Sequence, residues 1–531
     1  MLFASFGEGE KSAFNIRFIM LKSKNDGAPY ALTDASGLQK GINMKLKDTI
    51  KKRLTVQNLI LIAIFIVCIA ALLILCVDDG IDFDEAFSFI VTHNYNPAEV
   101  IQNTIEDNGP DLPIYYVFFA CWMAIFGDSW FICRLSSVFW TVLTMILGAT
   151  IVRKNWGYGA AYLFIILTAF APALIHINVN LRFYSLSIFL TTAFALNAYA
   201  MTKNAARKNW IIFFVLTLAI FFTHYYNVFG LFLIYIYIFI ALCLKDKKQL
   251  WKLFASGGIS TVLLVAYSFV KNFFHYISEN DNFNGINAEK IDYREAIDYS
   301  LKSGIKGSSA IWGTVIILFL VAAIIYAIRE KRENKGKWLF VILCLTAFPV
   351  SYIIGGYVSS LAFHFYTARH VSANLGLLWL GVAIFAGSRN KGIYIATLLL
   401  SVLTSISDFC GEYKYIRSST PELAETLAFI DDNMEPGDIV IYNGDEKFDM
   451  LYSCYMQEQE FYHITEVTDL SDFSDKRVWF MELVWGYWFD EDVLKGYNVD
   501  KEYFGHYGFQ IVGNNVTDFE LSRLRIYKDS Q

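Results

Sequence analysis

The amino-acid sequence predicts a polytopic α-helical membrane protein with about eleven spans, followed by a small C-terminal α/β domain. The first observation is composition: of 531 residues, 55% are hydrophobic and 17% aromatic, whereas only 18% are charged. Average soluble domains carry about 25% charged residues, so the surplus of apolar side chains is expected to face lipid. The other two observations are a series of apolar runs of spanning length and the distribution of basic residues between them.

Charge argues against nucleic-acid binding, and the cysteine spacing gives no sign of a redox pair or a metal site. The chain has 44 basic and 50 acidic residues, a net charge of −6, which leaves no strongly basic face for a phosphate backbone. Nucleic acid is therefore excluded as a partner. The eight cysteines form no C-x-x-C pair and show no metal-ligand spacing with histidine. Most of them lie in or beside apolar runs, where a thiol behaves as a small hydrophobic group.

The apolar runs predict eleven spans. The first covers residues 59–77, after a basic cluster at residues 45–53. The others cover residues 130–152, 157–176, 184–202, 210–223, 228–244, 253–270, 309–328, 338–354, 371–387 and 392–407. One more apolar stretch, residues 114–126, has only 13 residues, so we expect it to lie at the interface or to re-enter the membrane.

Basic residues predict the orientation. With the N-terminus in the cytoplasm, the inside loops after the first span carry sixteen Lys and Arg residues. Four of the outside loops carry only two together, and the longer segment 271–308 carries five. The positive-inside rule therefore supports both the orientation and the odd number of spans in the cell membrane. The predicted domains are a cytoplasmic segment, a transmembrane domain and an extracytoplasmic domain, at residues 1–56, 57–407 and 408–531.

The tail beyond the last span has the pattern of a small α/β domain. Its helices are predicted over residues 420–434 and 446–456, and its strands over residues 438–442, 477–483, 507–512 and 521–527. It contains two cysteines, Cys410 and Cys454, which can pair if the compartment is oxidising.

Ionisable residues avoid the predicted spans. The spans contain no Asp or Glu, and Arg134 and His176 lie near their outer ends. Ion-coupled transporters and proton pumps need carboxylates near the middle of the bilayer. This distribution disfavours such a transporter and draws attention to the outer face.

Acidic, basic and aromatic residues gather in the predicted outside loops. The first loop contains acidic residues and no basic residue from Asp78 to Asp111. One interpretation is a solvated loop in which Asp82 or Asp84 caps a helix. Three other clusters lie at the same depth, at residues 178–184, 223–227 and 365–370. Single Tyr, His and Arg residues there are ordinary membrane anchors, but three clusters opposite an acidic loop favour a binding or catalytic site.

Several of these segments resemble motifs of the GT-C membrane glycosyltransferases, in particular the protein O-mannosyltransferases and the lipid A aminoarabinose transferases. Over about residues 57–407, the resemblance rests on six segments in family order: Asp84-Glu85-Ala86-Phe87-Ser88, Asp111-Leu112-Pro113-Ile114-Tyr115-Tyr116, Phe126-Gly127-Asp128-Ser129, Arg134-Leu135-Ser136, Arg182-Phe183-Tyr184-Ser185-Leu186 and Thr223-His224-Tyr225-Tyr226. It implies a GT-C-like fold and a transferase that uses a lipid-linked sugar.

The chain also departs from the family pattern. Asp111 stands where the family often has His, Leu112 replaces the first Pro, and Asn180 stands where an acid commonly precedes the Arg. His370 and Asn374 occupy positions where relatives usually show Tyr and Pro. These differences leave the acidic motif and Arg182 unchanged, and they bear on the acceptor and the sugar.

The resemblance and the chemistry of the residues together assign roles. A donor outside the cell must travel with the bilayer, as a polyprenyl-phosphate sugar does, and its leaving phosphate needs cations and hydroxyl groups. The residues of that type are Arg182, Tyr184, His224, Tyr225 and Arg369.

The acceptor hydroxyl needs a base, because phosphate leaves without a general acid. Asp84 is the candidate base, with Glu85 as a helper or positioning residue. A single base acting opposite the departing phosphate predicts inversion at the anomeric carbon. Asp111 and His370 are assigned to the acceptor side or its loop.

No cofactor is required by this scheme, although Asp82 with Asp84 can supply oxygen ligands to a divalent cation. The expected partners are the polyprenyl-phosphate sugar, a lipid, protein or glycan acceptor, and membrane lipids. Two alternatives stay open. One is a non-enzymatic flippase or transporter of lipid-linked glycans, and the other is an inactive relative whose tail domain is a binding module.

Overall fold

A computed structural model of the chain describes residues 55–77, 80–93, 95–106, 112–271, 293–330, 332–362, 368–444, 453–484, 487–510 and 516–528. The chain divides into two compact units, Met1–Asn58 and Leu59–Gln531. Only residues 55–58 of the first unit are described, and the first helix begins at Val56.

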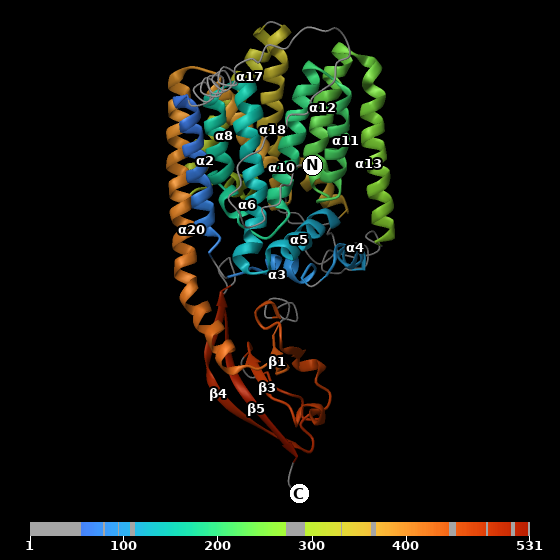
Figure 1. The fold of residues 1–531 in the computed structure, drawn as a ribbon, viewed down its shortest axis with the longest axis vertical. Coiled ribbons are helices and arrows are strands. Elements are labelled where there is room, and N and C mark those ends of the chain that lie inside the picture. Colours follow the sequence, from blue (N-terminus) through green and yellow to red (C-terminus); the bar gives the residue numbers. More distant parts are fainter. Residues whose placement is uncertain are drawn as a thin grey trace, which may run out of the picture. The chain divides into compact units, whose positions relative to one another are not determined.

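The second unit is the body of a multi-pass membrane protein. Within the described ranges, nine helices are long and apolar enough to cross a membrane: Val56–Leu75, Trp130–Trp156, Tyr184–Lys203, Asn227–Lys245, Lys247–Val270, Ser308–Arg329, Lys335–Val358, Ala368–Gly387 and Lys391–Ile416. Each falls on a predicted span. The predicted fold class is confirmed: a helical membrane protein with a small C-terminal sheet domain (Figure 1).

The elements of the membrane part are α2 (Val56–Leu75), α3 (Phe83–Ile90), α4 (Pro97–Glu106), α5 (Pro113–Phe126), α6 (Trp130–Leu147), η1 (Gly148–Val152), α7 (Arg153–Trp156), α8 (Tyr158–Phe170), α9 (Leu174–Ile177), α10 (Tyr184–Lys203), α11 (Arg207–Phe221), α12 (Asn227–Lys245), η2 (Lys247–Gln249), α13 (Leu250–Val270), α16 (Tyr293–Leu301), α17 (Ser308–Arg329), α18 (Arg332–Ala362), η3 (Ala368–Asn374), α19 (Leu375–Gly387) and α20 (Lys391–Asn433).

Two predicted spans form helices that are too short to belong to the nine described helices of spanning length. Helix α11 has 15 residues, about the length of its predicted apolar run, whereas α8 has only 13, although the predicted span continues to residue 176. Helix α8 ends because Ala171 precedes Pro172, and the residue before a proline is pushed out of the helical region; Ala171 is extended, with ψ at 154°. A hydropathy pattern alone does not show that the helix ends here.

Three short helices, α3, α4 and α5, lie together at one end of the helix bundle (Figure 1). Helix α5 has 14 residues and begins at Pro113, one residue before the apolar stretch that the sequence predicted not to cross the membrane. Proline suits the first position of a helix, because its missing N–H has no partner there in any case. This end of the bundle carries the acidic motif.

The middle of the bundle is α19. Every residue from Leu375 to Ala386 is buried, as expected of a helix that is apolar on all sides. Its last residue, Gly387, lies so close to α8 that an added Cβ would come within 2.3 Å of the Ala160 backbone nitrogen. Small residues allow the two helices to approach at this point.

The C-terminal domain is built on a five-stranded mixed sheet of order β2-β1-β3-β5-β4. Its strands are β1 (Ile439–Asn443), β2 (Glu460–His463), β3 (Val478–Glu482), β4 (Tyr497–Gln510) and β5 (Val516–Lys528), and two 3-10 turns follow β2, η5 (Ile464–Glu466) and η6 (Leu470–Phe473). Strand β1 is parallel to β2 and β3, whereas β5 is antiparallel to β3 and β4.

Alternate residues of β1 supply two cores. Val440 and Tyr442 pack with the end of α20, and Ile439 and Ile441 pack on the opposite face with the 3-10 turns. Successive strand side chains point to opposite faces, so a fully buried strand such as β1 requires cover on both.

The prediction located β1, β3 and β5 well, gave only one end of β4 and missed β2. The helix expected over residues 420–434 is present as the last part of α20, which runs without a break from Lys391 to Asn433. Most of the helix expected over residues 446–456 lies outside the described residues. Among the described residues, neither Cys410 nor Cys454 forms a disulfide bond.

Candidate active site

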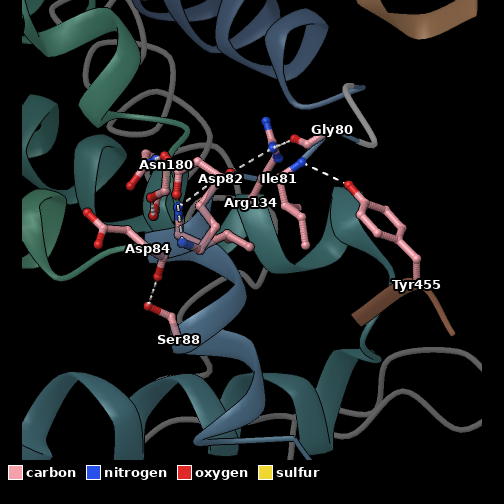
Figure 2. Close-up of polar contacts among 11 residues, drawn as sticks. Gly80, Ile81, Asp82, Asp84, Ser88, Arg134, Asn180 and Tyr455 are labelled. Atoms are coloured by element: carbon pink, nitrogen blue, oxygen red, sulfur yellow. Dashed lines mark hydrogen bonds and ion pairs between the residues drawn. The ribbon is translucent and has the colours of Figure 1, made fainter. Parts of the chain in front are cut away.

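Helix α3 begins at the acidic motif because the motif contains its own cap. The Asp82 Oδ1 accepts a hydrogen bond from the Glu85 N–H at 2.7 Å, and the Glu85 Oε2 accepts one from the Asp82 N–H at 3.1 Å. This reciprocal capping box satisfies two N–H groups that the start of a helix would otherwise leave unpaired. It places Asp84 in the first turn of α3 (Figure 2).

Glu85 is engaged on both of its oxygens. Its side chain is buried, and its Oε1 accepts a hydrogen bond from the Leu181 N–H at 2.9 Å. Its Oε2 lies 3.2 Å from the Arg134 Nη2, which also donates to the Gly80 carbonyl oxygen. Burial raises the pKa of this carboxyl above its ordinary value, and Arg134 and the backbone donors offset only part of the rise. These contacts favour the positioning role for Glu85.

Asp84 lies between two guanidinium groups that are far away in sequence. Its Oδ2 is 2.8 Å from the Arg369 Nη1, and its Oδ1 is 3.5 Å from the Arg182 Nη2. Burial alone would raise the pKa of Asp84, but the two arginines, together with His370, hold it below its ordinary value. The carboxylate is therefore ionised at neutral pH, and its side chain stays 24% exposed.

Arg182 also holds the backbone of α3. Its Nη1 donates to the Asp84 carbonyl oxygen at 3.1 Å and to the Ser88 Oγ at 3.2 Å. The guanidinium lies over the rings of Phe87 and Phe183, at 5.9 and 5.5 Å from their centroids. A planar cation with several donors can make all these contacts at once, so Arg182 is fixed in direction by its surroundings.

Two histidines lie in a group of aromatic rings beside the ion pairs. The ring of His224 stacks on Phe183 at 4.2 Å, and His370 stacks on Tyr226 at 5.0 Å; the two imidazoles are 5.8 Å apart. Burial, and then the nearby His370 and arginines, lower the pKa of His224 well below its ordinary value. This residue is thus a neutral hydrogen-bonding group rather than a cation, and its buried Nδ1 has no partner among the described residues.

The structure brings together most of the predicted donor-binding residues. Tyr184 is buried with its ring 4.5 Å from Phe183. Tyr225 is directed elsewhere, because its hydroxyl lies 3.0 Å from the Ser268 Oγ of α13. Its neighbour Tyr226 occupies the ring group instead. Asp111 lies outside the described residues.

The predicted cation ligands have other partners. Asp82 caps α3, and its Oδ2 accepts a hydrogen bond from the Asn180 Nδ2 at 3.2 Å. Asp84 pairs with the two arginines. In the part of the chain that the structure describes, no group of three or more His, Cys, Asp or Glu residues is arranged to hold a metal ion.

The sequence did not identify every residue of the site. Ser88 and Tyr116, whose hydroxyl lies 3.5 Å from the Arg182 Nη1, belong to segments that resemble the family motifs, but the sequence assigns them no role in the site. For Ser88, the spacing of four positions from Asp84 on the same helix face is a signal that could have identified it. The sequence places Arg134, an ionisable residue, near the outer end of a span, but it does not predict the ion pair between Arg134 and Glu85.

No family model matches the chain, and no curated protein matches it in sequence. Among solved structures, it is similar to ArnT from Cupriavidus metallidurans, in the apo state and bound to undecaprenyl phosphate. Both ArnT structures have a TM-score of 0.48, and the match covers 87% of this chain and 97% of the ArnT chain, at 10% and 11% identity.

A further similarity is to the archaeal oligosaccharyltransferase AglB from Archaeoglobus fulgidus, in complex with an inhibitory peptide and a dolichol-phosphate. Its TM-score is 0.41, at 10% identity over 79% of this chain and 69% of that chain. ArnT and AglB are GT-C glycosyltransferases, the group whose motifs the sequence resembles. At these identities the likeness concerns the fold alone.

Proposed function

We propose that the protein transfers a sugar, with inversion, from a polyprenyl-phosphate carrier to a hydroxyl group of an extracytoplasmic acceptor. The observation that carries this proposal is the Asp84 carboxylate between Arg182 and Arg369, at the end of the bundle that holds α3. One ionised acid and two cations are the groups that a phosphate leaving group and an acceptor hydroxyl require. The basic loops predicted on the cytoplasmic side support an outward position for this end.

The donor phosphate would bind to the two guanidinium groups. Arginine suits this role because its planar group binds two phosphate oxygens at once. Arg369 has a side chain that is 43% exposed, whereas that of Arg182 is 12% exposed, so Arg369 is the more accessible of the two. His224 would add a neutral hydrogen bond to the same group through its Nδ1.

The bond changes follow from these positions. The acceptor oxygen forms a bond to the anomeric carbon while the bond from that carbon to the phosphate oxygen breaks. The electron pair leaves with the polyprenyl phosphate, and the proton of the acceptor hydroxyl passes to Asp84. Water then takes this proton. Attack opposite the leaving group gives an inverted product.

Donor binding would also make Asp84 a better base. In the structure, Arg182 and Arg369 lower its pKa and so weaken its affinity for a proton. The phosphodiester of the donor carries one negative charge, and its binding to the same arginines neutralises part of their charge, so the pKa of Asp84 rises when the donor is in place. The acid would thus become effective only after the leaving group has been bound.

The test is a transfer assay with the purified protein. It is incubated with radiolabelled polyprenyl-phosphate mannose, glucose and aminoarabinose and with a membrane extract as the source of acceptors, and the labelled product is identified. The Asp84→Asn variant is expected to lose about 10²- to 10⁴-fold in rate while it inserts normally. Asp128→Asn is the control, because the exposed Asp128 pairs with His93 and not with the arginines.

Transfer by Asp84→Asn at the wild-type rate would remove Asp84 from the reaction. Absence of any labelled acceptor with the wild-type protein would contradict the proposal itself. If the labelled carrier instead crosses the bilayer of a proteoliposome unchanged, the protein is a flippase.

A further inference from the structure

We infer that Tyr455, in the C-terminal domain, is a positioning residue for the transfer reaction: it holds the start of α3 so that Asp84 stays between its two arginines. The inference rests on the proposed function. Its main observation is a hydrogen bond between parts of the chain that are 374 positions apart, in which the Ile81 N–H donates to the Tyr455 hydroxyl oxygen at 3.0 Å. Figure 2 shows the side chain of Tyr455 pointing toward the backbone of Ile81.

The Ile81 N–H lies in the middle of the segment that holds the start of α3 in position. The preceding residue, Gly80, has its carbonyl oxygen bonded to Arg134, and the following residue, Asp82, is bonded to Glu85. The three successive residues at the start of α3 are therefore held by three different side chains. Because α3 has only eight residues, and such a short helix is unstable alone, Asp84 depends on these external bonds for its position.

The ring of Tyr455 supports the same segment from another direction. Its centroid is 5.9 Å from that of Trp130, which in turn lies 4.7 Å from Phe89 of α3. The adjacent Cys454 donates from its thiol to the Ala86 carbonyl oxygen at 3.8 Å. Of these two neighbouring residues of the C-terminal domain, Cys454 thus contacts the backbone of α3 directly, and the ring of Tyr455 supports α3 through Trp130.

Through these contacts the C-terminal domain would contribute to catalysis by positioning Asp84, although it supplies no residue that touches the substrates. When residues 454 and 455 are in place, Ile81 is bonded and the first turn of α3 is closed. When the hydroxyl is removed, the turn can open and Asp84 can move relative to the anomeric carbon. A displacement of about 1 Å at a reacting group can reduce a rate about 100-fold.

The test uses the full chain and the Tyr455→Phe variant, which keeps the ring next to Trp130 and removes only the hydroxyl. The control is Tyr503→Phe, because Tyr503 is an exposed tyrosine of β4 in the same domain. The first measurement is hydrogen exchange of the peptides that cover residues 80–90. Loss of one hydrogen bond is expected to speed their exchange roughly fivefold in Tyr455→Phe and not in Tyr503→Phe.

The second measurement separates positioning from donor binding. For Tyr455→Phe we expect kcat to fall about 10- to 100-fold, while the KM for the lipid-linked donor stays within about twofold. A structural role without positioning would lower the amount of folded enzyme and leave the kcat per folded molecule unchanged.

Each other outcome overturns the inference. Exchange of residues 80–90 at the wild-type rate means that the hydroxyl does not hold α3, and faster exchange with unchanged kcat means that holding α3 does not matter for the reaction. Faster exchange that extends equally to β1 and β3 means that the variant unfolds the C-terminal domain. If the wild-type protein transfers no sugar, the proposed function fails, whereas the exchange measurement still decides whether Tyr455 holds α3.

Discussion

The Asp84 Oδ2 and the Arg369 Nη1 are 2.8 Å apart, although 285 positions separate the two residues in sequence. The pair joins the start of α3 to the start of η3. It also joins the proposed base to a proposed ligand of the donor phosphate, so a change in either residue alters the chemistry of the other.

The first prediction concerns the acid limb of the pH–rate profile. The pKa of Asp84 is held below its ordinary value, so the ionised base is present above that low pKa and activity is lost as the pH falls through it. Arg369→Gln removes one of the lowering charges. The limb should then move toward neutral pH by about one unit, since a neighbouring opposite charge lowers the pKa of an Asp by about 1 to 3 units.

The measurement is the profile of kcat/KM against pH for the wild type and the variant. Arg294→Gln serves as the control, because Arg294 is 89% exposed and pairs only loosely with Asp298, at 3.9 Å. An unchanged acid limb in Arg369→Gln would show that Asp84 is not the group that titrates.

The second prediction concerns the geometry of Arg182. Its guanidinium donates to the Asp84 carbonyl oxygen and to Ser88 while it faces the Asp84 carboxylate. Lysine carries the same charge but a single donor group on a flexible stem, so Arg182→Lys cannot make these contacts together. We expect kcat/KM for the lipid-linked donor to fall roughly 10- to 100-fold, measured by initial rates at varied donor concentration.

Arg523→Lys, in β5 of the C-terminal domain, is the matched control and should leave the donor kinetics unchanged. Equal donor kinetics for Arg182→Lys and the wild type would mean that only the charge at position 182 is needed.

The third prediction separates Glu85 from Asp84. Glu85→Gln replaces an acceptor-only carboxylate by an amide whose NH₂ must face a donor, and it leaves the buried Arg134 without its charge partner. Breaking a buried ion pair costs about 3 to 5 kcal/mol, so the variant should melt at a lower temperature in detergent. Glu99→Gln is a close control, because Glu99 makes the same kind of capping contact with Asn96 in an exposed position.

The control should lose less than about 1 kcal/mol. If the two variants melt at the same temperature, Glu85 does not hold α3 in the way described.

The fourth prediction concerns the packing of the bundle. Gly387→Ala would place a Cβ 2.3 Å from the Ala160 nitrogen and 2.6 Å from its Cα, and a backbone cannot move away as a flexible side chain can. The expected cost is about 1 to 3 kcal/mol, measured as a lower midpoint of thermal unfolding. Gly258→Ala in α13 should not lower it, since nothing lies within 4 Å of the added Cβ and alanine favours a helix over glycine. A wild-type midpoint for Gly387→Ala would refute the close approach of α19 and α8.

The amino-acid sequence by itself determined the features that depend on neighbouring positions. Apolar runs located the membrane helices, because the bilayer requires each spanning segment to satisfy its own backbone hydrogen bonds over about 20 residues. The Asp82 cap and the position of Asp84 in the first turn of α3 follow from four consecutive residues. Strand β2 escaped prediction because its four residues are mostly exposed or half-buried and are ordered only by pairing with β1.

Tertiary structure alone decided which side chains meet at the site. The sequence contains both Tyr225 and Tyr226, but the packing of α13 directs the first toward Ser268 and leaves the second beside His370. In the same way, only the fold brings Arg369 to Asp84 and Tyr455 to Ile81. The direction of a side chain depends on the shape and charge of groups hundreds of positions away, and no local pattern in the chain encodes them.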